Sequence, residues 1–392
     1  MGMYSALSVF LFSILVSQSH VSACSKHCDF PAIFNFGDGN SDTGAFAAWF
    51  FGQSPFFGQS YFNGSAGRVS DGRLLIDFIA TELGLPFLHP YMDSLGANFS
   101  HGANFANVFS TIQLPTANVI PSTPPPRGLN PVNLDIQVVS QFSQFTNRSQ
   151  TQGRAFEKFM PEPEDFVQAL YTIDIGQIDL TQEFLNNRTD DEVRAIVPGL
   201  INRLTANIKI LYSLGGRSFW IHNLGPNGCL PILLTLAPVP DDQLDSAGCA
   251  IRYNVLTQYF NTELKRGVDG LGTDFPLAAF TYVDIYSARY SLYQEPERYG
   301  FTHPLEACCG YGGRYNYGEN SLCGSTITVN GTQFTVVPCE NPSDYINYEG
   351  QTYTQAADEI TFNKISTGQL SHPPNSLKTA CPQFSFARVD DI

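Results

Sequence analysis

PAIFNFGD, at residues 31–38, decides the fold: it is a short apolar run that ends in a glycine and an aspartate. Runs of this form are typical of strands that are buried on both faces of a parallel sheet. The same form recurs in ALYTIDIG at 169–176, SFWIHNLG at 218–225 and AFTYVDIY at 279–286. We therefore predict that these four segments are strands of one parallel sheet.

The segment between the second and third of these runs has the pattern of a helix. Thr189 and Glu192 have the spacing of a capping box, and Gly215-Gly216 supplies a stop signal. Apolar residues recur at helical spacing between them, at Leu200, Leu204, Ile208 and Leu211. Strands that alternate with helices predict βαβ units. The expected fold class is therefore α/β, a three-layer α/β/α sandwich with a parallel sheet.

Composition and charge exclude several classes of protein. The chain has 392 residues, of which 43% are hydrophobic and 15% are charged, whereas roughly 25% charged is usual for globular proteins. Disordered and coiled-coil chains are therefore excluded. The formal net charge of -15 repels phosphate backbones, so we expect no nucleic-acid partner.

The N-terminal residues predict passage through the secretory route. SALSVFLFSILVS at 5–17 has the length of a signal-peptide core, and Val21-Ser22-Ala23 places small residues before a cleavage point. We predict a signal peptide at 1–23 and a single domain at 24–392, with the mature protein extracellular, apoplastic or vacuolar. The alternative for this run is a membrane anchor or a buried strand. No other segment approaches 18 apolar residues, so we expect no membrane span in the mature chain.

Sequons and cysteines are consistent with that route. Five Asn-X-Ser/Thr sequons predict glycosylation at Asn63, Asn98, Asn147, Asn187 and Asn330. All nine cysteines lie at or after position 24, and five of them crowd the last quarter of the chain. We predict disulfides that clamp the C-terminal region, with one thiol left over. No Cys/His quartet has zinc spacing, so no metal is expected.

Ligands of parallel sheets bind at the carboxyl ends of the strands. The segments to inspect are therefore 38–44, 176–179 and 223–228. GDGNSDTG at 37–44 has neither a Walker lysine nor GxGxxG spacing, so no nucleotide cofactor is expected. The Pro-rich stretch 115–131 is either a solvated loop or a loop that covers the carboxyl ends of the strands, where a ligand would bind.

FGDGNSDTG at 36–44 resembles the nucleophile block of the plant GDSL esterase/lipase family, which belongs to the SGNH hydrolases. Further blocks resemble the family in order along the chain: GR at 67–68, DGRLLIDF at 71–78, GANFA at 102–106, DIGQID at 174–179, HN at 222–223, GPNGC at 225–229 and NYEGQTYT at 347–354. The whole sequence is most similar to the early-nodulin/acetylesterase-like branch. The resemblance implies an SGNH-type sandwich and ester hydrolysis.

Members of that family use a serine nucleophile, a histidine base, an aspartate that orients it, and an oxyanion site with a glycine and an asparagine. The resemblance places Gly39 at the serine, Thr352 at the histidine, Glu349 at the aspartate and Ile178 at the asparagine, and it assigns the oxyanion glycine to Gly102. Glycine has no oxygen to acylate, and threonine accepts no proton near neutral pH. Phe109 follows GANFA where the family has a small residue, and it would narrow the pocket. We therefore predict that serine-based ester hydrolysis is lost.

Other residues near these blocks offer alternatives. Asp38, Asp179 and Glu349 are expected to converge on the cleft; Asp38 and Asp179 are either an acid/base pair or structural hydrogen-bonding groups. Four other residues carry groups of the kind that a replaced nucleophile or base would need, and we predict that each has a structural role instead: Ser41, His222, His303 and Tyr353.

Three functions stay open: a silenced protein that binds a carbohydrate, lipid, acylated metabolite or partner protein; an enzyme for isomerisation, cyclisation or transfer; and an esterase with an altered set of catalytic residues. The oligomeric state is left open.

Overall fold

The computed structural model describes residues 27–49, 54–93, 95–113, 132–151, 157–318 and 321–383. The predicted signal peptide at 1–23 and the Pro-rich stretch 115–131 lie outside the described residues.

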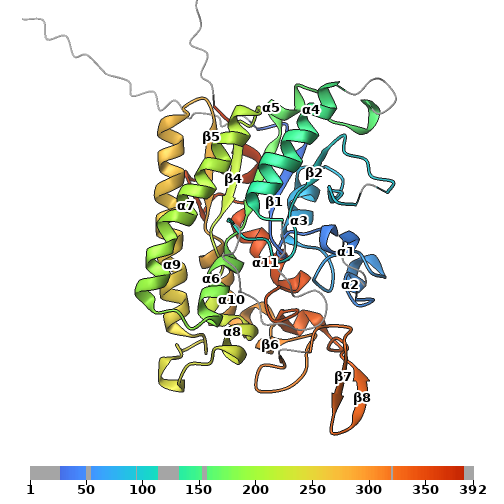
Figure 1. The fold of residues 1–392 in the computed structure, drawn as a ribbon, viewed down its shortest axis with the longest axis vertical. Helices are drawn as coiled ribbons and strands as arrows, with labels where there is room; N and C mark the ends of the chain where they lie inside the picture. The colour runs from blue at the N-terminus through green and yellow to red at the C-terminus, as the bar shows by residue number, and fades with distance from the viewer. Residues whose placement is uncertain are drawn as a thin grey trace, which may run out of the picture.

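A six-stranded sheet forms the centre of the molecule, in the order β10-β5-β4-β3-β1-β2 (Figure 1). The four predicted strands are confirmed as β1 (Ile33–Gly37), β3 (Leu170–Asp174), β4 (Ser218–His222) and β5 (Ala279–Val283), and the pairings among these four are parallel. Two edge strands were not predicted. β2 (Gly102–Asn104) is parallel to β1, and β10 (Ser371–His372) is antiparallel to β5.

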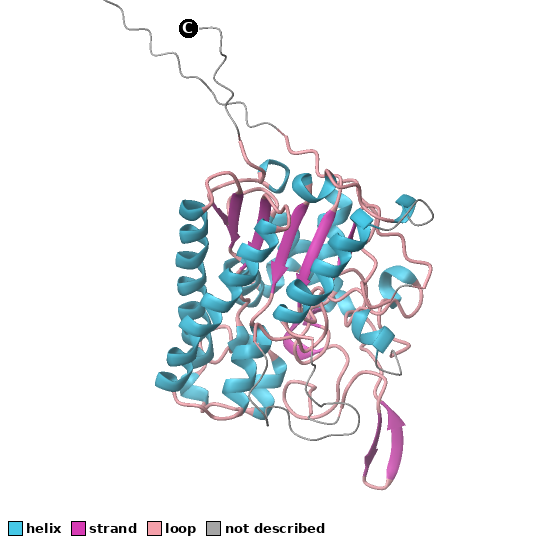
Figure 2. Ribbon diagram, turned by 45° about the horizontal axis from the view of Figure 1, so that its top comes forward, coloured by secondary structure: helices cyan, strands magenta, loops and turns pink. Residues whose placement is uncertain are grey.

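Helices lie on both faces of this sheet (Figure 2). Their bounds are α1 (Ala45–Trp49), α2 (Gln59–Phe62), α3 (Leu75–Glu82), α4 (Ser143–Thr151), α5 (Asp165–Gln168), α6 (Gln177–Leu185), α7 (Asp190–Ser213), α8 (Pro231–Leu236), α9 (Ile251–Asp274), α10 (Ile285–Gln294) and α11 (Gln355–Ile365). A π-helical turn at Ile136–Phe142 leads into α4. The predicted α/β class and three-layer sandwich are confirmed, with the sheet mostly parallel.

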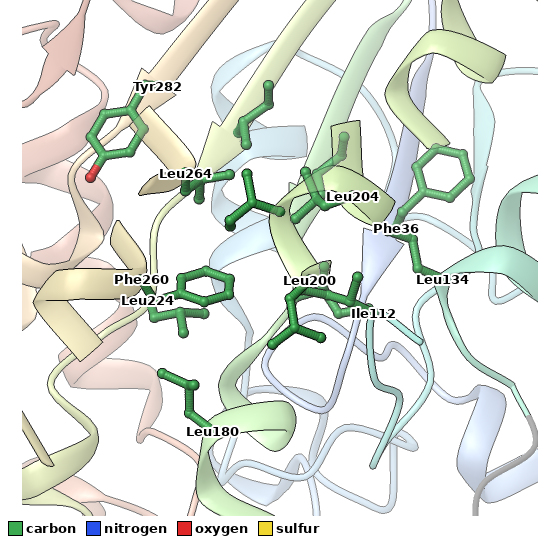
Figure 3. Close-up of a cluster of buried hydrophobic side chains, with 14 of the residues drawn as sticks. Phe36, Ile112, Leu134, Leu180, Leu200, Leu204, Leu224, Phe260, Leu264 and Tyr282 are labelled. Carbon is green, nitrogen blue, oxygen red and sulfur yellow. The ribbon is translucent and has the colours of Figure 1, made fainter. Parts of the chain in front are cut away.

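The strand side chains alternate between two hydrophobic clusters, as the pleat of a sheet requires. On one face Phe34 and Tyr171 join a large cluster with side chains of α4, α6, α7 and α9, part of which is drawn in Figure 3. On the other face Ile33, Leu170 and Trp220 pack with side chains of α3, α10 and α11. Because both faces are covered, these strands are buried along nearly their whole length, which is why the sequence runs lack a regular alternation of apolar and polar residues.

Helix α7 begins and ends where the sequence predicts. The Thr189 hydroxyl accepts from the Glu192 backbone N–H at 3.3 Å, and the Glu192 carboxylate accepts from the Thr189 N–H at 2.8 Å. The helix runs over Asp190–Ser213, and Gly215 then adopts a φ of 115° that favours glycine.

Four disulfides join the eight described cysteines. Cys308–Cys339 and Cys309–Cys323 hold the C-terminal region, as predicted, around the small parallel pair β6 (His303–Ala307) and β9 (Tyr345–Asn347) and the hairpin β7 (Thr326–Val329) and β8 (Thr332–Thr335). The other two, Cys229–Cys249 and Cys28–Cys381, lie elsewhere, and Cys24 is outside the described residues. Among the helices that the structure describes, none is both long and apolar enough to cross a bilayer.

Candidate functional site

A cavity of about 50 Å³ lies beyond the carboxyl ends of β1 and β3. Four of the residues that the resemblance singled out line it together: Gly39, Ile178, Glu349 and Thr352. The remaining described residues of its wall are Asp38, Asn40, Val69, Val108, Phe109, Gln177, Tyr317, Leu322, Gly350 and Gln351. Pockets for small molecules usually measure about 300–1,000 Å³. This cavity admits only a small group, not a whole ligand.

A chain of amide hydrogen bonds holds three loops around the cavity. Asn40, after β1, donates from Nδ2 to Gln177 Oε1 at 3.0 Å. Gln177, at the start of α6, donates from Nε2 to the backbone carbonyl of Gln351 at 3.0 Å. The residues after β1, those after β3 and those before α11 are thereby fixed relative to one another.

The loop after β2 forms a further wall of the cavity. Asp42 accepts from the backbone N–H of Val108 at 3.0 Å and also from the first N–H groups of α1, so one carboxylate joins this loop to the loop after β1. Phe109 follows with a φ of 65°, a conformation that a bulky side chain rarely adopts. Its ring meets the edge of Phe46 at a centroid distance of 5.9 Å. Phe109 therefore lines the cavity, as the sequence predicts, and the side chain of Tyr348, from the 347–354 block, is fully buried away from it.

The expectation that Gly102 supplies an oxyanion N–H is wrong. Gly102 opens β2 opposite Ile33, the first residue of β1, whereas the cavity lies beyond the other end of β1. Its N–H donates to the carbonyl of Phe99 at 2.9 Å. A Cβ at this position would meet the Ile33 carbonyl oxygen at 1.8 Å, so glycine permits two strands to approach closely.

Glu349 and Thr352 have different surroundings within the cavity. Glu349 Oε1 accepts from the backbone N–H of Cys323 at 2.9 Å, so this carboxylate is tied to a disulfide-held loop. The Thr352 hydroxyl is buried and has no partner among the described residues. A hydroxyl without a hydrogen-bonded base is not activated as a nucleophile.

The residues considered as substitutes are placed elsewhere. Ser41 is buried against the last residue of β1. Its Oγ lies only 2.5 Å from the position that a Cβ would occupy if Gly37 had a side chain. His222 contacts Asp174 through Nδ1 at 3.3 Å, and Tyr353 stacks on the Arg289 guanidinium at 3.8 Å. His303, in β6, contacts Glu306. None of these four side chains lines the cavity as it is described.

Asp38 is a buried carboxyl group of the cavity wall, next to Gly39 in the chain. Its Oδ1 accepts from the Asn40 N–H at 3.1 Å. Burial, followed by the charge of Asp174, raises the pKa of Asp38 well above its usual value. The pKa of Asp174 is lowered despite its burial, because it bonds to His222 and lies near the charges of His222 and Arg289. The pKa values of the two carboxyls are shifted in opposite directions, so Asp38 holds a proton more tightly than Asp174 does.

Comparison with known proteins decides the family. The family described as GDSL-like Lipase/Acylhydrolase matches residues 33–365. The chain belongs to this family. A protein named Esterase from Hevea brasiliensis is 51% identical, over 97% of this chain and 96% of that protein. A GDSL esterase/lipase from Arabidopsis thaliana is 47% identical over 95% and 97%, and Alpha-L-fucosidase 3 from the same plant is 44% identical over 92% and 96%.

The GDSL blocks do not contain every residue of the site. Asn40, Gln177 and Gln351 stand inside blocks that the resemblance quoted, but their role in joining the loops depends on geometry that spacing does not give. Tyr317 and Leu322 come from outside the blocks. Their nearest signal in the sequence is Cys323, whose pairing with Cys309 brings Leu322 toward Glu349.

The expectation that Asp179 converges on the cleft is also wrong. Asp179 is the third residue of α6, and its carboxylate accepts from the backbone N–H of Ile112 at 3.0 and 3.2 Å. It points to the Ile112 loop rather than lining the cavity. Burial raises the pKa of Asp179 to about 7. Among the described residues, no three His, Cys, Asp or Glu side chains are grouped as metal ligands would be.

The raised pKa of Asp179 makes the free energy of unfolding depend on pH. The unfolded chain loses this proton near pH 4 and the folded chain near pH 7, so this group lowers the free energy of unfolding progressively between those values. Asp179→Asn removes that change, which is worth about 1.4 kcal/mol for each pKa unit. We expect the variant to gain stability relative to the parent as pH rises from 4 to 7, by a few kcal/mol at most, in urea unfolding.

The matched control is Asp241→Asn, since Asp241 is an exposed carboxylate of the same type. Its stability difference from the parent is expected to change far less over the same range, because its side chain is 90% exposed. A constant difference for Asp179→Asn would contradict the shifted pKa.

Proposed function

We propose that this GDSL-family protein retains its cleft for ligand binding and does not hydrolyse esters through an acyl-serine. The observation that carries the proposal is the lining of the cavity: its described residues include no serine, cysteine, histidine or lysine. Gly39, Thr352, Ile178 and Glu349 stand where the resemblance expects serine, histidine, asparagine and aspartate. The ligand class is a small ester, an acylated sugar, a lipid-like compound or another plant metabolite.

The expected decrease in the rate of ester hydrolysis is large, which supports this proposal. Removing a catalytic triad lowered kcat by about 2 × 10⁶ in subtilisin. Removing one oxyanion donor costs about 10²–10³ in rate. Ile178 places an apolar side chain at the donor position, and Gly39 provides no nucleophile at all. An altered esterase would need another nucleophile, and Ser41 is buried outside the cavity.

A second candidate function is a conversion that needs no acyl-enzyme, such as an isomerisation, cyclisation or transfer. Asp38 supports it, because it lines the cavity and burial raises the pKa of its carboxyl, which suits general acid catalysis. The names of the relatives include an esterase and a fucosidase, so ligands with an ester or with a sugar are both included in the proposal.

We also propose that the protein is secreted as a single domain, residues 24–392, after removal of residues 1–23. Four disulfides are typical of an oxidising compartment. The predicted glycan sites are all exposed at the surface: Asn63, Asn98, Asn147, Asn187 and Asn330. Exposure is required for a glycan at any of them.

A fluorophosphonate probe and p-nitrophenyl acetate test the loss of hydrolysis. We expect no labelled serine and no turnover above that of heat-denatured protein, because no described residue of the cavity forms an acyl-enzyme with a neighbouring base. Mass spectrometry of the probe-treated protein and the release of p-nitrophenol are the measurements. An active serine esterase treated in parallel shows that the probe works, and a labelled serine in this protein would overturn the proposal.

A further inference from the structure

Gly37, the last residue of β1, has no strand beside it on the side of β2. β2 ends at Asn104, which pairs with Asn35, whereas β1 continues to Gly37. The side chain of Gln137 takes the place of the missing strand. The Gly37 N–H donates to Gln137 Oε1 at 3.0 Å, and Gln137 Nε2 donates to the Gly37 carbonyl at 2.8 Å, to which the Asn107 N–H also donates at 3.2 Å. Because the N–H only donates and the carbonyl only accepts, these bonds fix which way the carboxamide is turned.

The same carboxamide also holds the loop after β2. Gln137 Nε2 donates a further hydrogen bond to Ser110 Oγ at 3.1 Å. Ser110 follows Phe109 in the chain, and Phe109 lines the cavity. Gly37 stands two residues before Gly39, which lines it too. Gln137 itself is 0% exposed and is not among the described residues of the lining, so one buried side chain supports two walls of the cavity from behind.

Phe109 needs such support because its backbone has a φ of 65°. A conformation of this kind persists in a bulky residue only where the surrounding structure fixes it. On one side of Phe109, the Val108 N–H donates to Asp42 at 3.0 Å. On the other side, Ser110 is bonded through its hydroxyl to Gln137. The bond from Gln137 is therefore one of those that keep this wall of the cavity in place.

A π-helical turn, Ile136–Phe142, brings Gln137 to this position. Such turns are rare and are frequent at functional sites. Asp135, which precedes the turn, accepts from Arg203 Nη2 at 2.7 Å and from Asn207 Nδ2 at 2.8 Å, and both of these residues belong to α7. Since α7 packs into the larger hydrophobic cluster, the backbone of the turn is attached to a firm part of the protein.

We propose that Gln137 is a positioning residue of the cleft: it holds the segment with Gly39 and the segment with Phe109 at a fixed separation and thereby sets the size of the group that the cavity admits. This inference rests on the proposed function, because it concerns a cleft that binds a ligand. Glutamine suits the task, since its carboxamide is neutral and carries a donor beside an acceptor, as a peptide group does. A carboxylate would place a charge against the Gly37 carbonyl, and a thioether would make neither bond.

The test uses xenon as its probe, because small apolar cavities bind this gas. The apolar side chains of the lining include those of Val69, Val108, Phe109, Ile178 and Leu322. Xenon is titrated into the secreted protein at pH 5.5, and the amide shifts of Gly39 and Phe109 are followed by NMR. We expect both amides of the parent to shift. The absence of any shift in the parent would overturn the cavity as a binding site, and this inference with it.

Gln137→Met keeps nearly the length of glutamine but makes neither bond with Gly37. We expect it to weaken xenon binding about 3-fold or more, because supporting hydrogen bonds hold a site to within about 0.5 Å. Gln137→Glu is expected to bind xenon nearly as the parent does, since burial raises the pKa of a carboxyl and a protonated carboxyl keeps one donor and one acceptor.

Two results would overturn the proposal: parent-like binding in Gln137→Met, or binding in Gln137→Glu that is as weak as in Gln137→Met. Should Gln137→Met not fold, weak binding in Gln137→Glu overturns the proposal by itself. Gln141→Met is the matched control. Gln141 lies in the same π-helical turn and is buried, but its Nε2 donates to Met92 Sδ at 3.2 Å rather than to a loop of the cavity. We expect parent-like binding there, and an equal loss in this control would also overturn the role of Gln137.

A fluorophosphonate probe, applied to the same samples after the titration, separates this inference from the proposed function. A labelled serine in the parent would overturn the proposed function, whatever the xenon result. An unlabelled parent, together with weak xenon binding in Gln137→Met alone, supports both. An unlabelled parent, together with equal xenon binding in all variants, overturns only the role of Gln137.

Discussion

Introducing the three family residues, as Gly39→Ser, Ile178→Asn and Thr352→His, is expected to leave the protein without esterase activity. Adding Phe109→Gly to this triple variant is expected to raise its turnover of p-nitrophenyl acetate at least 10³-fold. Serine and histidine are both larger than the residues that they replace, and the cavity measures only about 50 Å³ before they are introduced. The Phe109 ring lines the same cavity, so its removal provides space for an acyl group.

The magnitude follows from the chemistry that the four changes assemble. A complete triad contributes on the order of 10⁶ in rate, and one oxyanion donor about 10²–10³. Glu349 remains longer than the aspartate of the family, so only part of that gain is expected. Phe109→Gly also suits a φ of 65°, so it relieves backbone strain.

Phe109→Gly alone is the control, and it is expected to be inactive because Gly39 still offers no nucleophile. Circular dichroism and the melting temperature establish that each variant is folded. An active triple variant would contradict the steric role of Phe109. A folded but inactive quadruple variant would show that the cleft differs from the family in further ways.

Gly102→Ala is expected to destabilise the fold severely, by more than about 3 kcal/mol, through overpacking and backbone strain. The added Cβ would lie 1.8 Å from the Ile33 carbonyl oxygen, and the φ of 102° disfavours any side chain. Since β1 is bonded on both sides, the sheet has little freedom to adjust. Chemical unfolding and the yield of secreted protein are the measurements.

Gly84→Ala separates backbone strain from steric overlap. Gly84 has a φ of 71°, but nothing lies within 4 Å of the position that its Cβ would occupy. We expect a loss of about 1–2 kcal/mol there, from the left-handed conformation alone. Equal losses at the two positions would mean that the contact between β1 and β2 does not require glycine.

The sequence predicted those parts of the fold whose cause is local. The four apolar runs became strands because both faces of the sheet are covered, and the capping box of Thr189 and Glu192 did begin a long helix. β2 and β10 are too short to have a pattern of their own. They exist because β1 and β5 present backbone groups to which they bond.

The sequence predicted those parts of the candidate site that directly follow strands, because the carboxyl ends of parallel strands lie at one edge of the sheet. The resemblance brought Gly39, Ile178, Glu349 and Thr352 to one place, and they do line one cavity. The resemblance misplaced Gly102 because a matching block identifies a segment of the chain. It does not show at which end of the sheet each residue of that segment lies. The resemblance misplaced Asp179 because the first turn of a helix directs successive side chains to different sides. The unpaired hydroxyl of Thr352 was unpredictable, since an unmade hydrogen bond leaves no pattern in a sequence.

The Cys28–Cys381 disulfide joins two residues 353 positions apart, close to both ends of the described chain. Backbone and disulfide together make a covalent ring that contains every strand and helix named above. A protease that cuts once after the exposed Leu95 opens that ring without releasing a fragment. The nicked protein stays one covalent molecule until its disulfides are reduced, and reduction then separates the segment before the cut from the segment after it, because the other three disulfides all lie after Leu95.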